Sequence, residues 1–125
     1  MNIKIRRLEF GDLSPFVQHQ ELLADPHAIV LVAFDGDEQV GFVLAHDLPR
    51  RRGAARQLFL YEVDVVESHR RRGIARLLLE HLAELGISEG FVLTEPDNEA
   101  ANALYEGVGG TRSDVVMWDF DFGAD

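Results

Sequence analysis

The chain has 125 residues, of which 46% are hydrophobic and 27% charged, and its formal net charge is −10. This length predicts one domain over residues 1–125 with a sizeable core. The absence of cysteine excludes disulfides and thiolate metal sites, and no apolar run reaches the roughly 18 residues of a membrane span. Because the N-terminal segment also has no apolar signal-peptide core, we expect a cytoplasmic protein with no membrane partner.

The negative charge comes from the C-terminal third of the chain. Residues 1–79 carry 11 basic and 11 acidic side chains, whereas residues 80–125 carry 11 acidic side chains and only Arg112 as a base. Such a surface either keeps the protein in solution or attracts a polycation, and the residues alone leave both interpretations open. It argues against a nucleic-acid partner, because the arginine clusters at 50–56 and 70–72 are short.

The N-terminal half predicts a strand, a short helix and a hairpin. Residues 2–9 alternate as a strand does, and residues 12–24 form a weak helix with Pro15 near its start. Two apolar segments, residues 28–34 and 39–46, flank a turn of Asp, Gly and Asp and predict paired strands.

The middle of the chain predicts a strand, a glycine turn and a helix. A basic loop over residues 48–56 leads to the strand candidate 57–66, rich in β-branched and aromatic residues. The helix candidate covers residues 72–85. Its apolar residues recur at helical spacing, and we expect Ile74, Leu77, Leu78 and Leu82 in the core.

The C-terminal part predicts a short strand, a helix and a final strand. The strand covers residues 91–94, the helix runs from about Asn98 to Val108 before Gly109-Gly110, and residues 114–122 alternate. The complete order, β-α-β-β-β-α-β-α-β, predicts an α/β domain whose mixed sheet is mostly antiparallel early and has parallel crossovers late.

The segment Arg70-Arg71-Arg72-Gly73-Ile74-Ala75 carries the most chemical information. Its glycine lets a ligand approach the backbone closely. The first helical turn that follows offers unpaired N–H groups and the positive end of a dipole. Together with the arginines, these groups predict a site for a pyrophosphate, and so for a nucleotide-bearing cofactor.

Two motifs point to a family. The spacing R-x-x-G-x-A over residues 70–75, after a V-x-V strand, resembles the coenzyme A-binding motif of the GNAT N-acetyltransferase superfamily. A second match, Asn98-x-x-Ala101-x-x-Leu104-Tyr105 followed by two glycines, resembles the next motif of that superfamily. The resemblance implies a single-domain GNAT fold, in which helices flank a mixed sheet and a splayed strand pair holds acetyl-CoA.

A finer resemblance is to the class I aminoglycoside 3-N-acetyltransferases. It rests on segments of the expected strands and helices, residues 31–35, 60–65, 69–75, 103–105 and 116–121. Glu62 stands where that group has an aspartate, and the region before Ala28 is short. The resemblance implies acetyl transfer to the 3-amino group of an aminoglycoside antibiotic, and thus antibiotic resistance.

The resemblance also assigns two catalytic roles. Glu62 is the expected base, which takes a proton from the acceptor ammonium directly or through a water, if burial raises its pKa. Tyr105 is the expected acid that protonates the departing thiolate of coenzyme A. From the residues alone, Glu62 can instead be a solvated strand carboxylate and Tyr105 a packed ring.

The cofactor is expected to contact the backbone more than side chains. Amides near Val65 and Val66 are the expected donors to the acetyl carbonyl, and one or two arginine side chains meet the phosphates. Asn98 is expected to cap its helix and, by resemblance, to reach the pantetheine arm. The expected cofactor-binding residues are Val63, Val65, Val66, Arg70, Arg71, Arg72, Gly73, Ile74, Ala75, Arg76, Asn98 and Ala101.

Carboxylates are the candidates for binding a cationic acceptor, because each can hold an ammonium group. Asp64 shares the face of Glu62 in a regular strand, unless a β-bulge turns it away. The five histidines have no spacing typical of a metal site, and His69 is interpreted as a loop residue. The candidate acceptor-binding residues are Glu62, Asp64, Glu95, Asp97, Asp119 and Asp121.

Other functions stay open at this point. The acceptor can instead be a polyamine, an amino acid or a protein amine, and the domain can instead sense acetyl-CoA without catalysis. The final alternating strand can also pair across a homodimer, as edge strands do.

Overall fold

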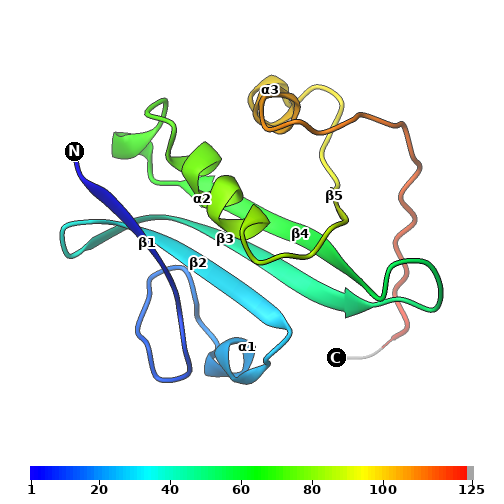
Figure 1. The fold of residues 1–125 in the computed structure, drawn as a ribbon, viewed down its shortest axis with the longest axis horizontal. Coiled ribbons are helices and arrows are strands. Elements are labelled where there is room, and N and C mark those ends of the chain that lie inside the picture. The colour runs from blue at the N-terminus through cyan, green and yellow to red at the C-terminus, as the bar shows by residue number, and fades with distance from the viewer. Residues whose placement is uncertain (124–125) are drawn as a thin grey trace.

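A single five-stranded sheet, seen in a computed structural model that describes residues 1–123, organises the molecule (Figure 1). Its order is β1-β2-β3-β4-β5; the first four strands pair antiparallel, and β5 pairs parallel to β4. This confirms the expected mixed, mostly antiparallel sheet. The strands are β1 (Ile3–Arg7), β2 (Ala28–Asp35), β3 (Glu38–Pro49), β4 (Arg56–Val65) and β5 (Gly90–Val92).

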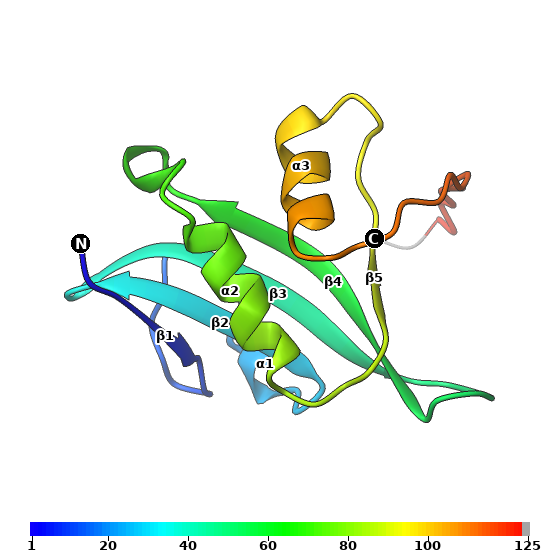
Figure 2. The same ribbon diagram turned by 45° about the horizontal axis from the view of Figure 1, so that its top comes forward.

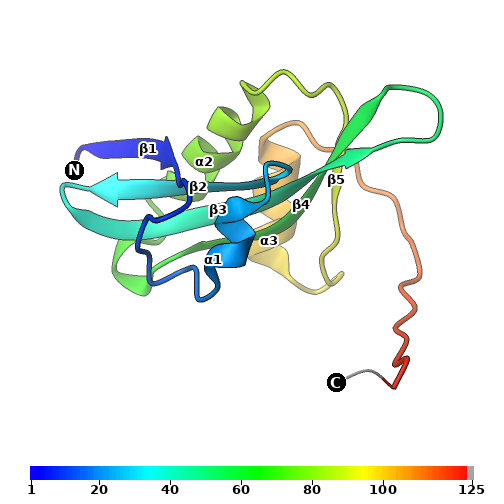
Figure 3. The same ribbon diagram turned by 90° about the horizontal axis from the view of Figure 1, so that it is seen from below.

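Helices cover both faces of this sheet. One face packs against α2 (Ile74–Ala83) and, further along, α3 (Glu99–Gly107), whereas α1 (Gln20–Ala24) lies on the other face (Figure 3). A short 3-10 helix, η1 (Glu67–His69), joins β4 to the loop before α2. None of the helices in the described part of the chain is long and apolar enough to cross a bilayer.

The core on the α2 face follows the spacing of the helix with one correction. Ile74, Leu78 and Leu82 are buried as expected, and Leu79 is buried with them. Leu77, expected in the core, is 39% exposed. The buried residues at i, i+4 and i+8, with Leu79 beside them, define a stripe on the sheet-facing side, and Leu77 lies beyond its edge.

The first predicted helix is much shorter than expected. Only α1 is helical, and the rest of the predicted helix, residues 12–19, forms a loop held by side-chain hydrogen bonds. The Ser14 hydroxyl accepts from the Phe16 amide at 3.1 Å, and the Gln20 side chain donates to the Asp12 carbonyl at 2.9 Å. Serine and glutamine here offer the backbone local partners in place of helical ones.

The predicted basic loop over residues 48–56 is also shorter. The β3 strand extends to Pro49 and β4 begins at Arg56, so the connection covers residues 50–55. Arg56 pairs with the carboxylate of Asp47 and donates to its carbonyl at 2.8 Å. This ion pair across the two strands stabilises the extension of the hairpin.

The final predicted strand, residues 114–122, is wrong. Residues 111–122, here called the C-terminal arm, are extended, but no backbone hydrogen bond among the described residues joins them to another segment (Figure 1). An alternating sequence indicates that a segment can form a strand, but the strand forms only where a neighbouring strand is present to pair with it. The arm leaves α3 at Gly109-Gly110 and exposes Val115, Val116, Met117, Trp118, Phe120 and Phe122.

Candidate functional site

The strands β4 and β5 separate soon after they meet. They pair only through Leu58–Gly90, Phe59–Phe91 and Leu60–Val92. Beyond this point β4 continues to Val65, whereas the chain after β5 turns away toward α3 (Figure 2). The edge of β4 that faces β5 is therefore open from Tyr61 onward, which is the splay that the resemblance implied.

Backbone groups of β4 point into this opening. The Val66 amide donates to the Val40 carbonyl at 2.9 Å, so it is committed to β3. Alternation along an antiparallel pair then aims the amides of Val63 and Val65 at the open edge. The Val65 amide donates to Asp64 Oδ1 at 2.9 Å. Of the expected pair of carbonyl-polarising amides, Val65 faces the opening and Val66 does not.

The loop between η1 and α2 has the backbone shape of an anion site. Arg71 and Gly73 both adopt left-handed conformations, with φ of 63° and 79°, and Arg71 is the one non-glycine residue with positive φ in the described chain. Such turns gather successive N–H groups on one side. The first helical turn adds the amides of Ile74, Ala75 and Arg76, which precede the first intrahelical bond, Leu77 N–H to the Gly73 carbonyl.

The four arginines around this loop have different partners. Arg70 Nε donates to the Val65 carbonyl at 2.8 Å, and its Nη2 lies 3.4 Å from Asp64 Oδ1. Arg76 forms a long, exposed ion pair with Glu80. Arg70 is therefore tied to the end of β4, whereas Arg71, Arg72 and Arg76 are exposed around the loop and can turn toward an anion.

Glu62 faces the opposite side of the sheet from α2. A register shift between β3 and β4 pairs Leu44 with Glu62 and Ala45 with Leu60, so Tyr61 is an extra residue. Because this bulge precedes Glu62, it does not separate Glu62 from Asp64. Glu62 lies opposite Leu44 and Asp64 opposite Phe42, on the face that α1 covers.

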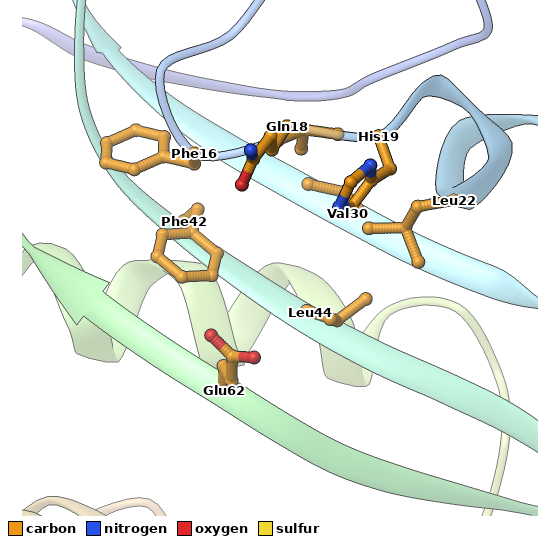
Figure 4. Close-up of a pocket in the computed structure, with 9 residues that line it drawn as sticks. Phe16, Gln18, His19, Leu22, Val30, Phe42, Leu44 and Glu62 are labelled. Carbon is orange, nitrogen blue, oxygen red and sulfur yellow. The ribbon is translucent and has the colours of Figure 1, made fainter. Parts of the chain in front are cut away.

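A cavity of about 300 Å³ lies on this face (Figure 4). The rings of Phe16 and Phe42 stack at its wall, 4.9 Å between centroids, and Glu62 supplies the one carboxylate among the described residues that line it. His19 also lines it, although no motif or spacing in the sequence singles this residue out. The lining residues are Phe16, Val17, Gln18, His19, Leu22, Val30, Phe42, Leu44 and Glu62.

The α3 helix places a tyrosine beside the core. Asn98 caps the helix, since its side chain accepts from the Ala101 amide at 3.1 Å. Asn102, which sequence reasoning missed, donates to the carbonyls of Glu95 and Asn98 and so shapes the preceding loop. Tyr105 is half-buried, and this burial raises its pKa above the usual 10.0. Its hydroxyl stays protonated at neutral pH and can donate a proton.

The other predicted acceptor carboxylates do not gather at the cavity. Asp64 turns to the Val65 amide and Arg70. Glu95 and Asp97 are exposed in the loop before α3, and Asp119 and Asp121 lie on the C-terminal arm. Among the described residues, no cluster of three His, Cys, Asp or Glu side chains suits a metal ion.

Known proteins resemble this chain in sequence and structure. Residues 3–109 match the acetyltransferase (GNAT) family. An L-2,4-diaminobutyric acid acetyltransferase of Marinococcus halophilus is 34% identical over 118 residues, which cover 91% of this chain and 65% of that protein. A second such enzyme, from Methylotuvimicrobium alcaliphilum, is 31% identical over 77% of this chain and 58% of its own length. The chain thus spans less than two thirds of these relatives.

Solved structures share the whole fold. An aminoglycoside acetyltransferase from an uncultured soil metagenomic sample superposes with a TM-score of 0.83 at 26% identity, over 97% of this chain and 99% of the other. The aminoglycoside N-acetyltransferase AAC(6')-Iy in complex with CoA gives a TM-score of 0.76 at 17% identity, over 97% of this chain and 95% of that chain. At 17% identity, the similarity to AAC(6')-Iy shows a shared fold and no more.

Proposed function

The chain belongs to the acetyltransferase (GNAT) family, and from this premise we propose that it transfers the acetyl group of acetyl-CoA to a primary amine of a cationic small molecule. Enzymes of this family use acetyl-CoA, and a structural neighbour is solved with CoA. The observation that carries the proposal is the position of Glu62, an exposed residue of β4 that lines the cavity on the strand whose edge is open.

The residues at the opening fit the cofactor. The amides of residues 71–75 would hold the diphosphate, because left-handed turns and a helix N-terminus present them together. Arg71, Arg72 and Arg76 would add charge, and Asn98 and Ala101 would border the pantetheine arm. Val63, Val65 and Val66 would flank the thioester, with the Val63 and Val65 amides closest to its oxygen.

Bound acetyl-CoA supplies a thioester whose carbonyl carbon accepts the amine. Glu62 would take one proton from the acceptor ammonium, which leaves a neutral amine with a free electron pair. The amides of Val63 and Val65 would donate to the carbonyl oxygen while the carbon–nitrogen bond forms. Tyr105 would give its proton to the sulfur as the carbon–sulfur bond breaks, and the nitrogen of the product would release its second proton to solvent to leave a neutral amide. Solvent would return both side chains to their starting states.

The 3-amino group of an aminoglycoside is the first acceptor we propose. It is supported by the resemblance of the sequence motifs and by the 26% identical aminoglycoside acetyltransferase. Glu62 would then bind the reacting amine. The further ammonium groups would meet Asp64, Glu95, Asp97, Asp119 or Asp121 outside the cavity.

A small diamino acid is the second candidate. The 34% identical relative is a diaminobutyric acid acetyltransferase. A cavity of about 300 Å³ with one carboxylate also suits one small amine without help from remote residues.

The two acceptors are separated by one assay of thiol release. Acetyl-CoA is incubated with the protein and with gentamicin, 2,4-diaminobutyrate, spermidine or a lysine peptide. Turnover on gentamicin supports the first acceptor, and turnover only on diaminobutyrate supports the second. Turnover only on spermidine or the peptide makes the acceptor a polyamine or protein amine. Saturable binding of acetyl-CoA without turnover on any amine would identify a sensor and overturn the proposed transfer.

A further inference from the structure

His69 is a buried polar residue directly before the loop of residues 70–73, here called the diphosphate loop, and the proposed reaction does not use it. It is 9% exposed and lies at the end of η1, directly before Arg70. Its Nε2 lies 2.8 Å from Oδ2 of Asp35, and its Nδ1 lies 2.8 Å from the Ser68 hydroxyl. Asp35 is the last residue of β2, so the two residues join segments 34 positions apart.

The side chains of His69, Asp35 and Ser68 can satisfy one another's hydrogen-bonding groups. A neutral imidazole has one N–H donor and one acceptor nitrogen. The Nε2–H can donate to the Asp35 carboxylate while Nδ1 accepts from the Ser68 hydroxyl. A buried polar group is costly unless it is paired in this way. The pairing therefore fixes the position of His69 relative to the β2–β3 hairpin.

The loop that follows His69 needs anchors at both ends. Its two left-handed residues, Arg71 and Gly73, make a conformation that a free chain seldom adopts. At the C-terminal end, Ile74 is buried in the core and holds the start of α2. At the N-terminal end, the His69 amide donates to the Val66 carbonyl at 3.0 Å, and the His69 side chain reaches Asp35.

We propose that His69, held by Asp35 and Ser68, is a positioning residue that keeps the amides of residues 71–75 aligned on the cofactor diphosphate. This rests on the proposed function, because it assumes that the loop binds the diphosphate. His69 itself touches no phosphate. It acts by fixing where the loop begins, because its side chain bonds Asp35 at the end of β2, which is held in the sheet.

A loosened loop and a damaged fold have different effects on the binding of CoA and of pantetheine. CoA carries the diphosphate and a phosphorylated adenosine, whereas pantetheine has the same thiol arm without either. Loosening the loop therefore weakens binding of CoA and leaves binding of pantetheine unchanged. Damage to the whole fold weakens both. The ratio of the two dissociation constants therefore reports on binding of the phosphate-bearing half of CoA, and it needs no turnover to measure.

The experiment measures Kd of CoA and of pantetheine by calorimetry for the wild type, Asp35→Ala, Asp35→Asn and His69→Gln. His81→Gln is the matched control, since His81 lies on α2, away from the loop, and bonds the Leu77 carbonyl. We expect Kd of CoA to rise about ten-fold in Asp35→Ala and His69→Gln. We expect Asp35→Asn, which keeps an acceptor, to retain most of the affinity, and pantetheine to bind all variants within about two-fold.

Each outcome decides the proposal. Equal weakening of CoA and pantetheine, or unchanged CoA binding in both His69→Gln and Asp35→Ala, overturns it. A wild type that binds CoA no better than pantetheine also overturns it, because the loop then holds no diphosphate. A wild type that binds CoA selectively but acetylates no amine would instead refute the proposed transfer. In that case the variant ratios still decide the role of His69.

Discussion

Asp64 accepts a hydrogen bond from the backbone N–H of its neighbour Val65, with 2.9 Å between Oδ1 and N. The same oxygen lies 3.4 Å from Nη2 of Arg70, whose Nε donates to the Val65 carbonyl. Asp64 and Arg70 thus occupy both backbone polar groups that Val65 presents to the open edge of β4. A thioester that uses the Val65 amide must first displace the Asp64 carboxylate.

Replacing Asp64 by alanine tests this competition. We expect Asp64→Ala to lower Kd of acetyl-CoA by about three-fold to ten-fold, the worth of one net hydrogen bond. Asp64→Asn, which keeps an acceptor oxygen, serves as the control and should bind as the wild type does. Calorimetry gives the affinity and initial rates give KM of the amine. A higher KM of the amine with unchanged cofactor affinity would instead make Asp64 an acceptor-binding residue.

Glu62→Gln separates catalysis from binding. The glutamine keeps the size of the side chain but cannot take a proton, so we expect kcat to fall by about 10² to 10³. Kd of CoA should stay within about two-fold, because Glu62 faces the cavity and not the diphosphate loop. Glu38→Gln, in the β2–β3 hairpin, is the matched control. An unchanged kcat in Glu62→Gln would remove Glu62 from the role of base.

Tyr105→Phe tests the proton donor and its pKa. Burial raises the pKa of the wild-type hydroxyl above 10.0, so this group causes no loss of kcat below that pH. We expect the variant to lose about ten-fold or more in kcat. Because the folded pKa is raised, the contribution of the neutral hydroxyl to stability is complete below pH 10 and is lost as pH rises through the folded pKa. Urea unfolding at pH 8 and pH 11 should show this loss in the wild type only.

Gly73→Val and its control Gly86→Val replace two glycines that have nearly the same backbone conformation. Gly73 has φ of 79° and Gly86 has φ of 82°, and at both positions the space that a β-carbon would enter is free of other atoms to 4 Å. Valine should therefore cost about 1–2 kcal/mol of stability at each position through backbone strain. Only Gly73→Val should also weaken CoA binding, by about ten-fold or more, because a side chain blocks the backbone approach. Normal affinity in Gly73→Val would argue against the loop as the diphosphate site.

Local sequence signals located the strands and the loop but not what packs on them. The β-branched run at residues 57–66 and the glycine turn at 70–73 predict their structures because neighbours in sequence determine them. The cavity beside Glu62 depends on Phe16 and Phe42, which are far apart in the chain. The splay of β4 and β5 likewise depends on where β5 ends, which periodicity does not encode.

Two further predictions differ from the structure for the same reason, which is that local sequence does not show a residue's distant partners. His69 sits in a run of polar residues, so the pattern indicates an exposed loop, whereas its partner Asp35 lies 34 positions earlier. The alternation of residues 114–122 indicates strand propensity correctly but cannot supply the neighbouring strand. Pairing is a property of the assembled sheet, which explains why an alternating segment is extended and yet unpaired in the described chain.

The C-terminal arm leads to a last prediction, that two copies of this chain pair in solution. Val116, Trp118, Phe120 and Phe122 stand at alternate positions along the arm, and all four are exposed, Trp118 by 77%. The rings of Phe120 and Phe122 stack on each other. The outer edge of β5 is the last edge of the sheet, and Phe91 of this strand is 39% exposed although its ring stacks on that of Phe59. An apolar arm and an open edge in one chain can complement each other between two copies related by a two-fold axis.

The only tryptophan of the chain lies on this arm, so its fluorescence reports the pairing directly. We expect light scattering to give a dimer at micromolar concentration, and Trp118 emission to shift to the red on dilution as the dimer dissociates. Phe120→Asp should give a monomer with red-shifted emission, because a charge then enters the apolar contact. Leu13→Asp is the matched control, since Leu13 is 85% exposed on a distant loop. A wild-type monomer with blue-shifted Trp118 emission at every concentration would show that the arm folds onto its own chain instead.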